Sequence, residues 1–111
     1  MDYKEICRAA KAALDEKMGE KIRILDIKNI SSIADGFVLA TGSSISQLRA
    51  MSDNVEEKLA KIGVYVRHIE GYSEAEWILM DFGSIIVHIF KKDKREFFDL
   101  DRIWSDAEEI I

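Results

Sequence analysis

Four side chains supply the residue types from which a catalytic site could be assembled in this chain. Ser43 or Ser44 could act as a nucleophile, with His88 as its base and Asp81 as the carboxylate that orients the base. The neighbouring sequence offers no oxyanion feature, and Asp81 and His88 are expected on one sheet face among large apolar side chains. We therefore interpret Asp81 and His88 as residues that contact a partner, and we predict no catalytic residue.

A phosphate or metal site is the second chemistry that the sequence could support, at residues 41–44. The Gly-Ser pair there follows a predicted strand, as in nucleotidyltransferase active sites, but no phosphate-binding lysine comes after it. Nucleotidyl transfer also requires two carboxylates on a following strand to hold magnesium ions, and the next predicted strand, residues 64–69, has none. His68 and His88 lack a cysteine or carboxylate at a ligand-like spacing. The sequence predicts neither a metal nor a cofactor.

Helices and strands that alternate along the chain must position these residues. Apolar side chains at steps of three and four indicate helices, and Ser44 with Gln47 has the spacing of a capping box. Asp99 is expected to cap a helix in the tail. The predicted elements are a helix from Tyr3 to Gly19, strands at 21–28 and 36–41, a helix from Ser44 to Gly63, a strand at 64–69, a hairpin at 76–90 and a C-terminal helix from about Lys94. This order predicts one α/β (α+β) domain over residues 1–111, a small mixed β-sheet with helices mainly on one face.

The register of the predicted hairpin decides which of its side chains share a face. A two-residue turn at Phe82-Gly83 would place Trp77 opposite His88. Strand alternation then gives one aliphatic face, made of Ile78, Met80, Ile85, Val87 and Ile89. The other face, called the mixed face below, combines large apolar groups with polar ones: Trp77, Leu79, Asp81, Ser84, Ile86, His88 and Phe90.

If helices cover only the aliphatic face, the mixed face is open to solvent and has the composition of a protein-binding surface. Two alternatives stay open. The C-terminal helix could cover the mixed face through Ile103 and Trp104, or a second copy of the chain could do so. An open apolar face would also favour a homodimer of the free protein.

Composition and charge restrict the partners and the compartment. The chain has 16 Lys and Arg against 21 Asp and Glu, a net charge of -5, which disfavours direct nucleic-acid readout and favours a basic partner. The cluster Lys91, Lys92, Lys94 and Arg95 is interpreted as a solvated loop, with a peripheral RNA contact beside a protein partner as the alternative. Cys7 is the only cysteine, and neither a signal peptide nor a run of about 18 apolar residues occurs. These features predict a cytoplasmic protein with no membrane partner.

Several segments form a recognisable pattern along the chain: Ser31 to Asp35, Phe37 to Ser44, Gln47, Glu70-Gly71, Trp77 to Gly83, Val87 to Phe90, Arg95 with Phe98, and Leu100 to Trp104. In this order, and over nearly the whole chain, they resemble the ribosome silencing factor family, also called Iojap-like. Two positions depart from the family pattern, because Gly36 stands where an aromatic residue is usual and Phe82 where tyrosine is usual.

The resemblance implies a nucleotidyltransferase-like α/β fold that carries out no nucleotidyl transfer. It also implies binding to the large ribosomal subunit through its L-fourteen protein, which sterically blocks association with the small subunit and represses translation under nutrient limitation. An assembly factor for the large subunit and a metal-dependent nucleotidyltransferase-like enzyme are the alternatives.

We expect the mixed face of the hairpin to be the partner-binding site. Apolar and aromatic contacts are predicted for Trp77, Leu79, Ile86, His88 and Phe90. Asp81 and Glu70 are predicted to meet basic side chains of the ribosomal protein.

Overall fold

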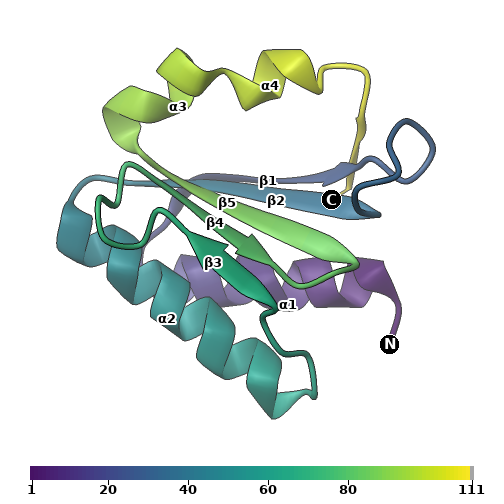
Figure 1. Cartoon of the computed structure of the whole chain (residues 1–111), viewed down its shortest axis with the longest axis horizontal. Helices are drawn as coiled ribbons and strands as arrows, with labels where there is room; N and C mark the ends of the chain where they lie inside the picture. Colours follow the sequence, from purple (N-terminus) through teal and green to yellow (C-terminus); the bar gives the residue numbers. More distant parts are fainter. Residues whose placement is uncertain (111) are drawn as a thin grey trace.

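A six-stranded sheet with helices on both sides organises the chain, and the computed structural model describes residues 1–110 (Figure 1). The helices are α1 (Tyr3–Glu16), α2 (Ile45–Lys61), α3 (Lys92–Phe98) and α4 (Leu100–Ile103). The strands are β1 (Glu20–Asp26), β2 (Gly36–Gly42), β3 (His68–Glu70), β4 (Trp77–Asp81), β5 (Ile85–Lys91) and β6 (Glu108–Ile110). They lie in the order β3-β4-β5-β2-β1-β6, with β2 and β5 parallel and the other neighbours antiparallel. The predicted fold class, a mixed sheet with helices, is confirmed.

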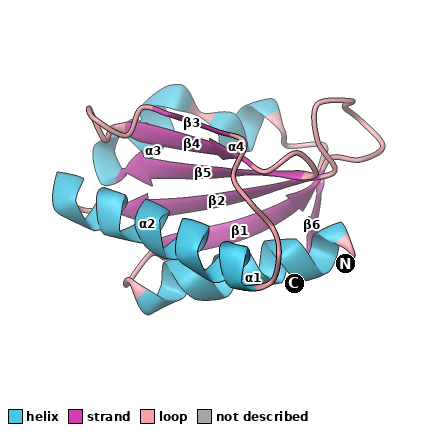
Figure 2. Ribbon diagram, turned by 60° about the horizontal axis from the view of Figure 1, so that its bottom comes forward, coloured by secondary structure: helices cyan, strands magenta, loops and turns pink. Residues whose placement is uncertain are grey.

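Helices α1 and α2 cover the aliphatic face of the sheet, as Figure 2 shows. The predicted apolar stripe of α1 is buried at Ile6, Cys7, Ala10 and Leu14. The helix ends at Glu16, before the predicted end at Gly19, and Met18 is exposed. Burial raises the pKa of the Cys7 thiol to about 12, so this residue serves as a small core hydrophobe. The predicted start of α2 is also confirmed, because the Ser44 hydroxyl accepts a hydrogen bond from the Gln47 backbone N–H at 3.1 Å.

The turn of the hairpin lies one residue further along the chain than predicted. Gly83 and Ser84 form it, and the backbone N–H of Phe82 donates to the carbonyl of Ile85 at 3.0 Å. Gly83 has a φ of +89°, a left-handed conformation that glycine adopts at little cost as the first turn residue. The glycine therefore sets where the chain reverses.

The shifted turn leaves the predicted faces intact. Each cross-strand partner moves by two residues, so that Trp77 lies opposite Phe90 and Leu79 opposite His88. Because side chains alternate with a period of two, a shift of two residues keeps every side chain on its predicted face. The aliphatic set packs against α1 and α2, and the mixed set lies on the other side of the sheet.

The mixed face is not bare, which corrects the expectation that it is open along its whole length. After β5 the chain turns back over this face as α3 and α4, and β6 then pairs antiparallel with β1 (Figure 1). Leu100, Phe98 and Trp104 pack there into a second apolar cluster with Phe37 and Phe90. The C-terminal segment, residues 92–110, thus covers part of the mixed face. This agrees with the alternative in which the chain's own C-terminal helix covers that face.

Two local predictions were only partly right, and one strand was missed. Of the predicted strand at 64–69, only His68 and Ile69 belong to β3, and β6 was not predicted. Asp99 occupies the N-cap position of α4, as predicted, but its side chain makes no capping hydrogen bond. Its backbone is left-handed, with a φ of 55°, and it separates α3 from α4. Its carboxylate instead accepts a hydrogen bond from Arg102 at 2.7 Å. Within residues 1–110, none of the helices is long and apolar enough to cross a membrane.

Candidate protein-binding surface

The C-terminal segment divides the mixed face into a covered part and an open part. The covered part involves β1, β2 and β5, whose residues share the second apolar cluster with Phe98, Leu100 and Trp104. Strands β3 and β4 extend beyond it at the edge of the sheet. The seven predicted contact residues separate accordingly: Phe90 and His88 are buried, Trp77, Leu79, Asp81 and Ile86 are partly exposed, and Glu70 is exposed.

Phe90 is a core residue, which corrects its prediction as a surface contact. Its side chain is 0% exposed. Its ring lies 5.2 Å from that of Trp77 and 6.1 Å from that of Phe98, measured between centroids. The C-terminal segment therefore occupies the position that a partner was expected to take against this ring.

His88 is also buried, at 3% exposure, and its polar atoms face the interior. Its Nδ1 accepts a hydrogen bond from the indole Nε1–H of Trp77 at 3.1 Å, and its ring meets that of Phe37 edge-on at 4.6 Å. Because Nδ1 accepts, the neutral ring carries its proton on Nε2, which is buried and has no hydrogen-bond partner among the described residues. Burial lowers the pKa of His88 to about 3, so the ring is neutral near pH 7.

Acid is expected to destabilise the fold through His88. The pKa of His88 rises from about 3 in the folded protein to its ordinary value, 6.5, on unfolding. Between these pH values only the unfolded chain binds the proton, so the free energy of unfolding should fall as the pH decreases, by up to about 1.4 kcal/mol per pH unit. Urea unfolding from pH 7 to pH 3 measures this slope.

The variant for this experiment is His88→Phe, which removes the buried imidazole. The His88→Phe slope should be shallower than the wild-type slope by that amount. Equal slopes for wild type and His88→Phe would show that His88 is not buried as a neutral ring in solution.

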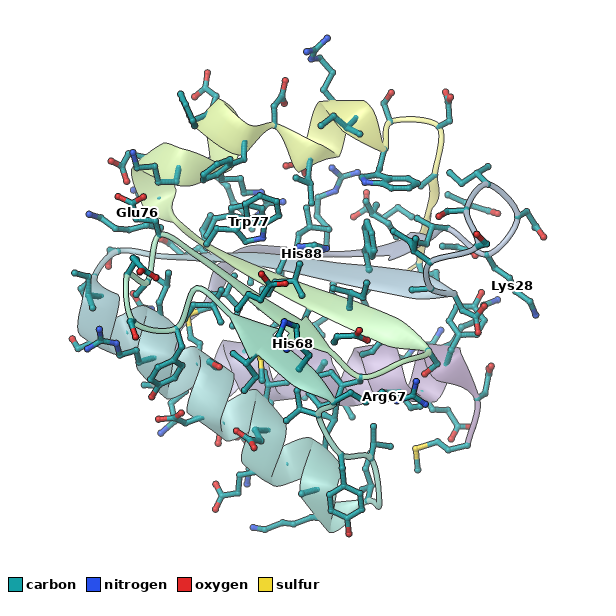
Figure 3. The ribbon with its side chains drawn as sticks, in the orientation of Figure 1. Lys28, Arg67, His68, Glu76, Trp77 and His88 are labelled. Carbon is teal, nitrogen blue, oxygen red and sulfur yellow. The ribbon has the colours of Figure 1, made fainter. Side chains whose placement is uncertain are left out.

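The open part of the mixed face is continuous across three strands. His68 lies opposite Asp81, and Glu70 lies opposite Leu79, in the pairing of β3 with β4. Asp81 in turn lies opposite Ile86 on β5. We call this set the open surface: His68, Glu70, Leu79, Asp81 and Ile86. Figure 3 labels His68 on β3, and it labels Trp77 and His88 between the sheet and α3.

The open surface combines two partly exposed aliphatic side chains with two carboxylates. The Asp81 carboxylate accepts a hydrogen bond from the Gly83 backbone N–H at 2.8 Å. The Glu70 carboxylate lies 3.2 Å from Nε2 of His68, a residue that sequence reasoning did not place on this surface. Strand alternation was the signal that could have found His68, because it shares the parity of Glu70. A surface of this composition favours a partner with basic side chains around an apolar contact.

The loop that leads into β4 is held from two sides. Gly71 has a φ of +78°, and a Cβ at this position would lie 2.1 Å from the Trp77 carbonyl oxygen, so only glycine fits. The Arg49 guanidinium of α2 donates to the Tyr72 carbonyl at 3.1 Å, and the Tyr72 hydroxyl donates to the Asp53 carboxylate at 2.9 Å. Helix α2 thereby fixes the entry of Trp77 into the sheet.

An ion-pair network holds the C-terminal segment on the sheet. The Arg95 guanidinium, 8% exposed as a residue, donates to both Asp101 oxygens at 3.0 Å and to the Lys21 carbonyl at 2.5 Å. Arg23 of β1 donates to Asp101 at 2.7 Å and to Glu109 at 3.0 Å. These guanidinium groups, Arg95 first, lower the pKa of Asp101 to about 2. The predicted solvated basic loop is therefore corrected, since α3 is a helix and Arg95 is buried.

The residues considered for nucleophilic catalysis do not come together. Ser43 and Ser44 follow the carboxyl end of β2. Asp81 lies opposite Ile86 on β5, and Ile86 lies opposite Phe37, which is near the amino end of β2. The Nδ1 atom of His88 is occupied by Trp77. The arrangement does not bring Ser43 or Ser44 together with His88 and Asp81 as a nucleophile, its base and the orienting carboxylate.

Comparison with known proteins shows what this chain is similar to. Residues 1–111 match the family model described as "Ribosomal silencing factor during starvation". The chain is 38% identical over 107 residues to "Ribosomal silencing factor RsfS" of Bacillus subtilis, covering 96% of this chain and 91% of that protein. It is 26% identical over 96 residues to mouse "Mitochondrial assembly of ribosomal large subunit protein 1", covering 83% of this chain and 42% of that protein. A crystal structure of a Chromobacterium violaceum protein is similar with a TM-score of 0.92 and 32% identity, covering 95% of this chain and 88% of that one.

Proposed function

Because this chain belongs to the ribosomal silencing factor family, we propose that it binds the large ribosomal subunit through the L-fourteen protein and sterically blocks association with the small subunit. Occupying that site represses translation under nutrient limitation and requires no covalent chemistry. The observation that carries the proposal is the open surface, where Leu79 and Ile86 lie beside Glu70 and Asp81 on a sheet face that is otherwise covered.

The chemistry of the open surface supports a basic protein as the partner. Leu79 and Ile86 provide apolar area that a partner can remove from water, which is the main source of affinity. Glu70 and Asp81 select for Lys and Arg across the interface and speed association. The net charge of -5 adds attraction to a basic protein and repulsion from exposed RNA phosphates. We accordingly propose a protein contact in the cytoplasm, with ribosomal RNA contacted at most at its periphery.

A steric mode of action also agrees with the separation of the possible catalytic groups. The Ser43 hydroxyl is hydrogen-bonded to the Gln47 side chain at 3.0 Å, and His88 is buried against Trp77. We therefore propose that the protein is not an enzyme. Calorimetric titration with nucleotide and magnesium tests this, because micromolar nucleotide binding would favour the enzyme alternative.

Replacing Leu79 with arginine is expected to weaken binding to the large subunit by at least about thirtyfold, or about 2 kcal/mol. The substitution removes apolar contact area at the centre of the open surface and sets a positive charge against a basic partner. Because Leu79 is partly exposed, the fold should tolerate it. Cosedimentation of the purified protein with purified large subunits measures the affinity.

Two further variants make this experiment specific. Ile62→Arg changes an exposed aliphatic residue at the end of α2, away from the open surface, and should bind as wild type. Asp81→Asn keeps an oxygen acceptor for the Gly83 N–H and removes the charge. Its affinity should therefore be lower than that of wild type, and the difference between the two should be largest at low salt. A Leu79→Arg protein that is folded by circular dichroism and pellets like wild type would refute the assigned surface.

Blocking of subunit association requires its own measurement, because a protein can bind the large subunit without obstructing it. Light scattering after mixing small and large subunits reports their association. Wild-type protein should reduce the scattering amplitude in proportion to its occupancy, and Leu79→Arg should not. Full association at saturating wild-type protein would refute the steric mechanism while leaving the binding intact.

Assembly of the large subunit is the second candidate function, and the name of the similar mouse protein favours it. The same surface would then act on an immature subunit. Sucrose gradients of cells depleted of the protein separate the two roles. Accumulation of large-subunit precursors supports assembly, whereas excess joined ribosomes during starvation support silencing.

A homodimer of the free protein stays a prediction, although less apolar surface is open for self-association than the sequence suggested. The expectation depended on an open apolar sheet face, and the C-terminal segment covers much of that face. Light scattering at several protein concentrations tests for a dimer.

A further inference from the structure

Trp77 lies at the border between the covered cluster and the open surface. Its ring contacts Phe98 of α3 at 4.8 Å and Phe90 at 5.2 Å, between centroids, so the C-terminal segment and the sheet enclose part of it. Its indole Nε1–H donates to Nδ1 of His88 at 3.1 Å. This bond runs diagonally between β4 and β5, because the residue directly opposite Trp77 is Phe90.

The imidazole of His88 is in surroundings that would suit an apolar ring. It is 3% exposed and lies among Phe37, Trp77 and Phe90. Its Nε2–H is buried without a partner in residues 1–110, which costs free energy that phenylalanine at this position would not. What histidine supplies here and phenylalanine cannot is a nitrogen acceptor for the indole.

We infer that His88 is a positioning residue for the partner-binding surface. Its buried Nδ1 atom accepts the hydrogen bond from the Trp77 indole and so fixes the rotamer of Trp77, next to Leu79 on the same face of β4. The inference rests on the proposed function, since it concerns the same surface. An indole held in one rotamer before binding does not lose that rotational freedom on binding, so affinity is higher than for an indole that must be ordered by the partner. His88 thus acts through Trp77 and touches no partner atom itself.

The test compares His88→Phe, His88→Leu and His88→Asn. The first two remove the acceptor and keep an apolar side chain, and His88→Leu serves if the phenylalanine ring does not fit. Asparagine carries an oxygen near the position of Nδ1 and should restore the bond. Urea unfolding should show that His88→Phe or His88→Leu stays folded at neutral pH.

The indole resonance of Trp77 reports the hydrogen bond directly. Nitrogen-15 spectra contain one Nε1–H signal for Trp77 and one for Trp104, which Trp77→Phe assigns. In His88→Phe the Trp77 signal should move and exchange faster with solvent, and in His88→Asn it should return towards the wild-type position. The Trp104 signal is the internal control, because the Trp104 ring packs edge-on against Phe37 at 5.1 Å between centroids.

Affinity for large subunits should fall about tenfold in His88→Phe, the size expected when one side chain must be immobilised on binding. In a Trp77→Phe background, the same His88→Phe change should have no further effect on affinity. An equal loss in both backgrounds, or wild-type binding by a folded His88→Phe protein, would overturn the positioning role.

Failure of this inference can be told apart from failure of the proposed function. If wild-type protein does not cosediment with large subunits, the proposed function is wrong, and the indole signal still decides whether His88 holds Trp77. If wild type binds and Leu79→Arg does not, while His88→Phe binds normally, only the role of His88 is refuted.

Discussion

Phe90→Ala should lower the free energy of unfolding by about 3–5 kcal/mol, the range for removing a large aromatic side chain from a packed core. The ring is 0% exposed and lies between the sheet and the C-terminal segment. Its removal leaves a cavity beside Trp77 and Phe98 that neither ring can fill without leaving its own contacts. Equilibrium unfolding in urea measures the change.

Phe97→Ala is the matched control for Phe90→Ala. Phe97 is 75% exposed on α3, so its replacement should change stability by no more than about 0.5 kcal/mol. Equal stability of the two variants would show that the C-terminal segment does not cover the sheet in solution. A loss of ribosome binding in Phe90→Ala would report a damaged fold and not a lost contact, because the ring is inaccessible to a partner.

Asp101→Ala should lower the free energy of unfolding by about 3 kcal/mol, because it leaves the buried Arg95 guanidinium without its carboxylate. Because the Asp101 side chain is 29% exposed, we expect the loss of stability to lie at the lower end of the range of about 3–5 kcal/mol for breaking a buried ion pair. Glu109→Ala removes a more exposed partner of Arg23 and should cost at most about 1 kcal/mol. Urea unfolding of the three proteins tests this order.

Hydrogen exchange locates the effect of Asp101→Ala. Amides of the C-terminal segment, including the Trp104 N–H that donates to Leu100, should exchange faster, while those pairing β2 with β5 change less. The pKa of Asp101, about 2 when folded and 3.8 ordinarily, adds an acid effect. Stability from this carboxylate is complete above pH 3.8 and is lost as the pH falls towards 2. Uniform exchange along the sheet and the segment would contradict a role confined to this segment.

Local patterns predicted much of the fold. The apolar spacing of α1, the Ser44 cap of α2 and the two hairpin faces depend on side chains within a few residues of one another. The two faces of β4 and β5 were predicted correctly although the turn was not, because a shift of two residues in the pairing keeps each side chain on its face. The family pattern added what such spacing cannot, the expected partner and mode of action.

The candidate site was predicted less completely. Sequence patterns placed all seven candidate residues on or beside the mixed face, but they could not tell which of them the chain itself covers. Trp77 meets Phe98, and Arg23 meets Glu109 86 positions away, contacts that no local period encodes. For the same reason β6 could not be predicted from local spacing, because its three residues form a strand only by pairing with the free edge of β1.

The sequence by itself therefore determined most of the helices and strands, the two faces of the hairpin and the family. Tertiary structure decided that Phe90 is core, that His88 supports Trp77, and that Glu70, Leu79, Asp81 and Ile86 stay accessible. The physical reason is that alternation reports the side to which a residue points. Whether water, a partner or another part of the chain lies on that side depends on contacts between segments far apart in sequence.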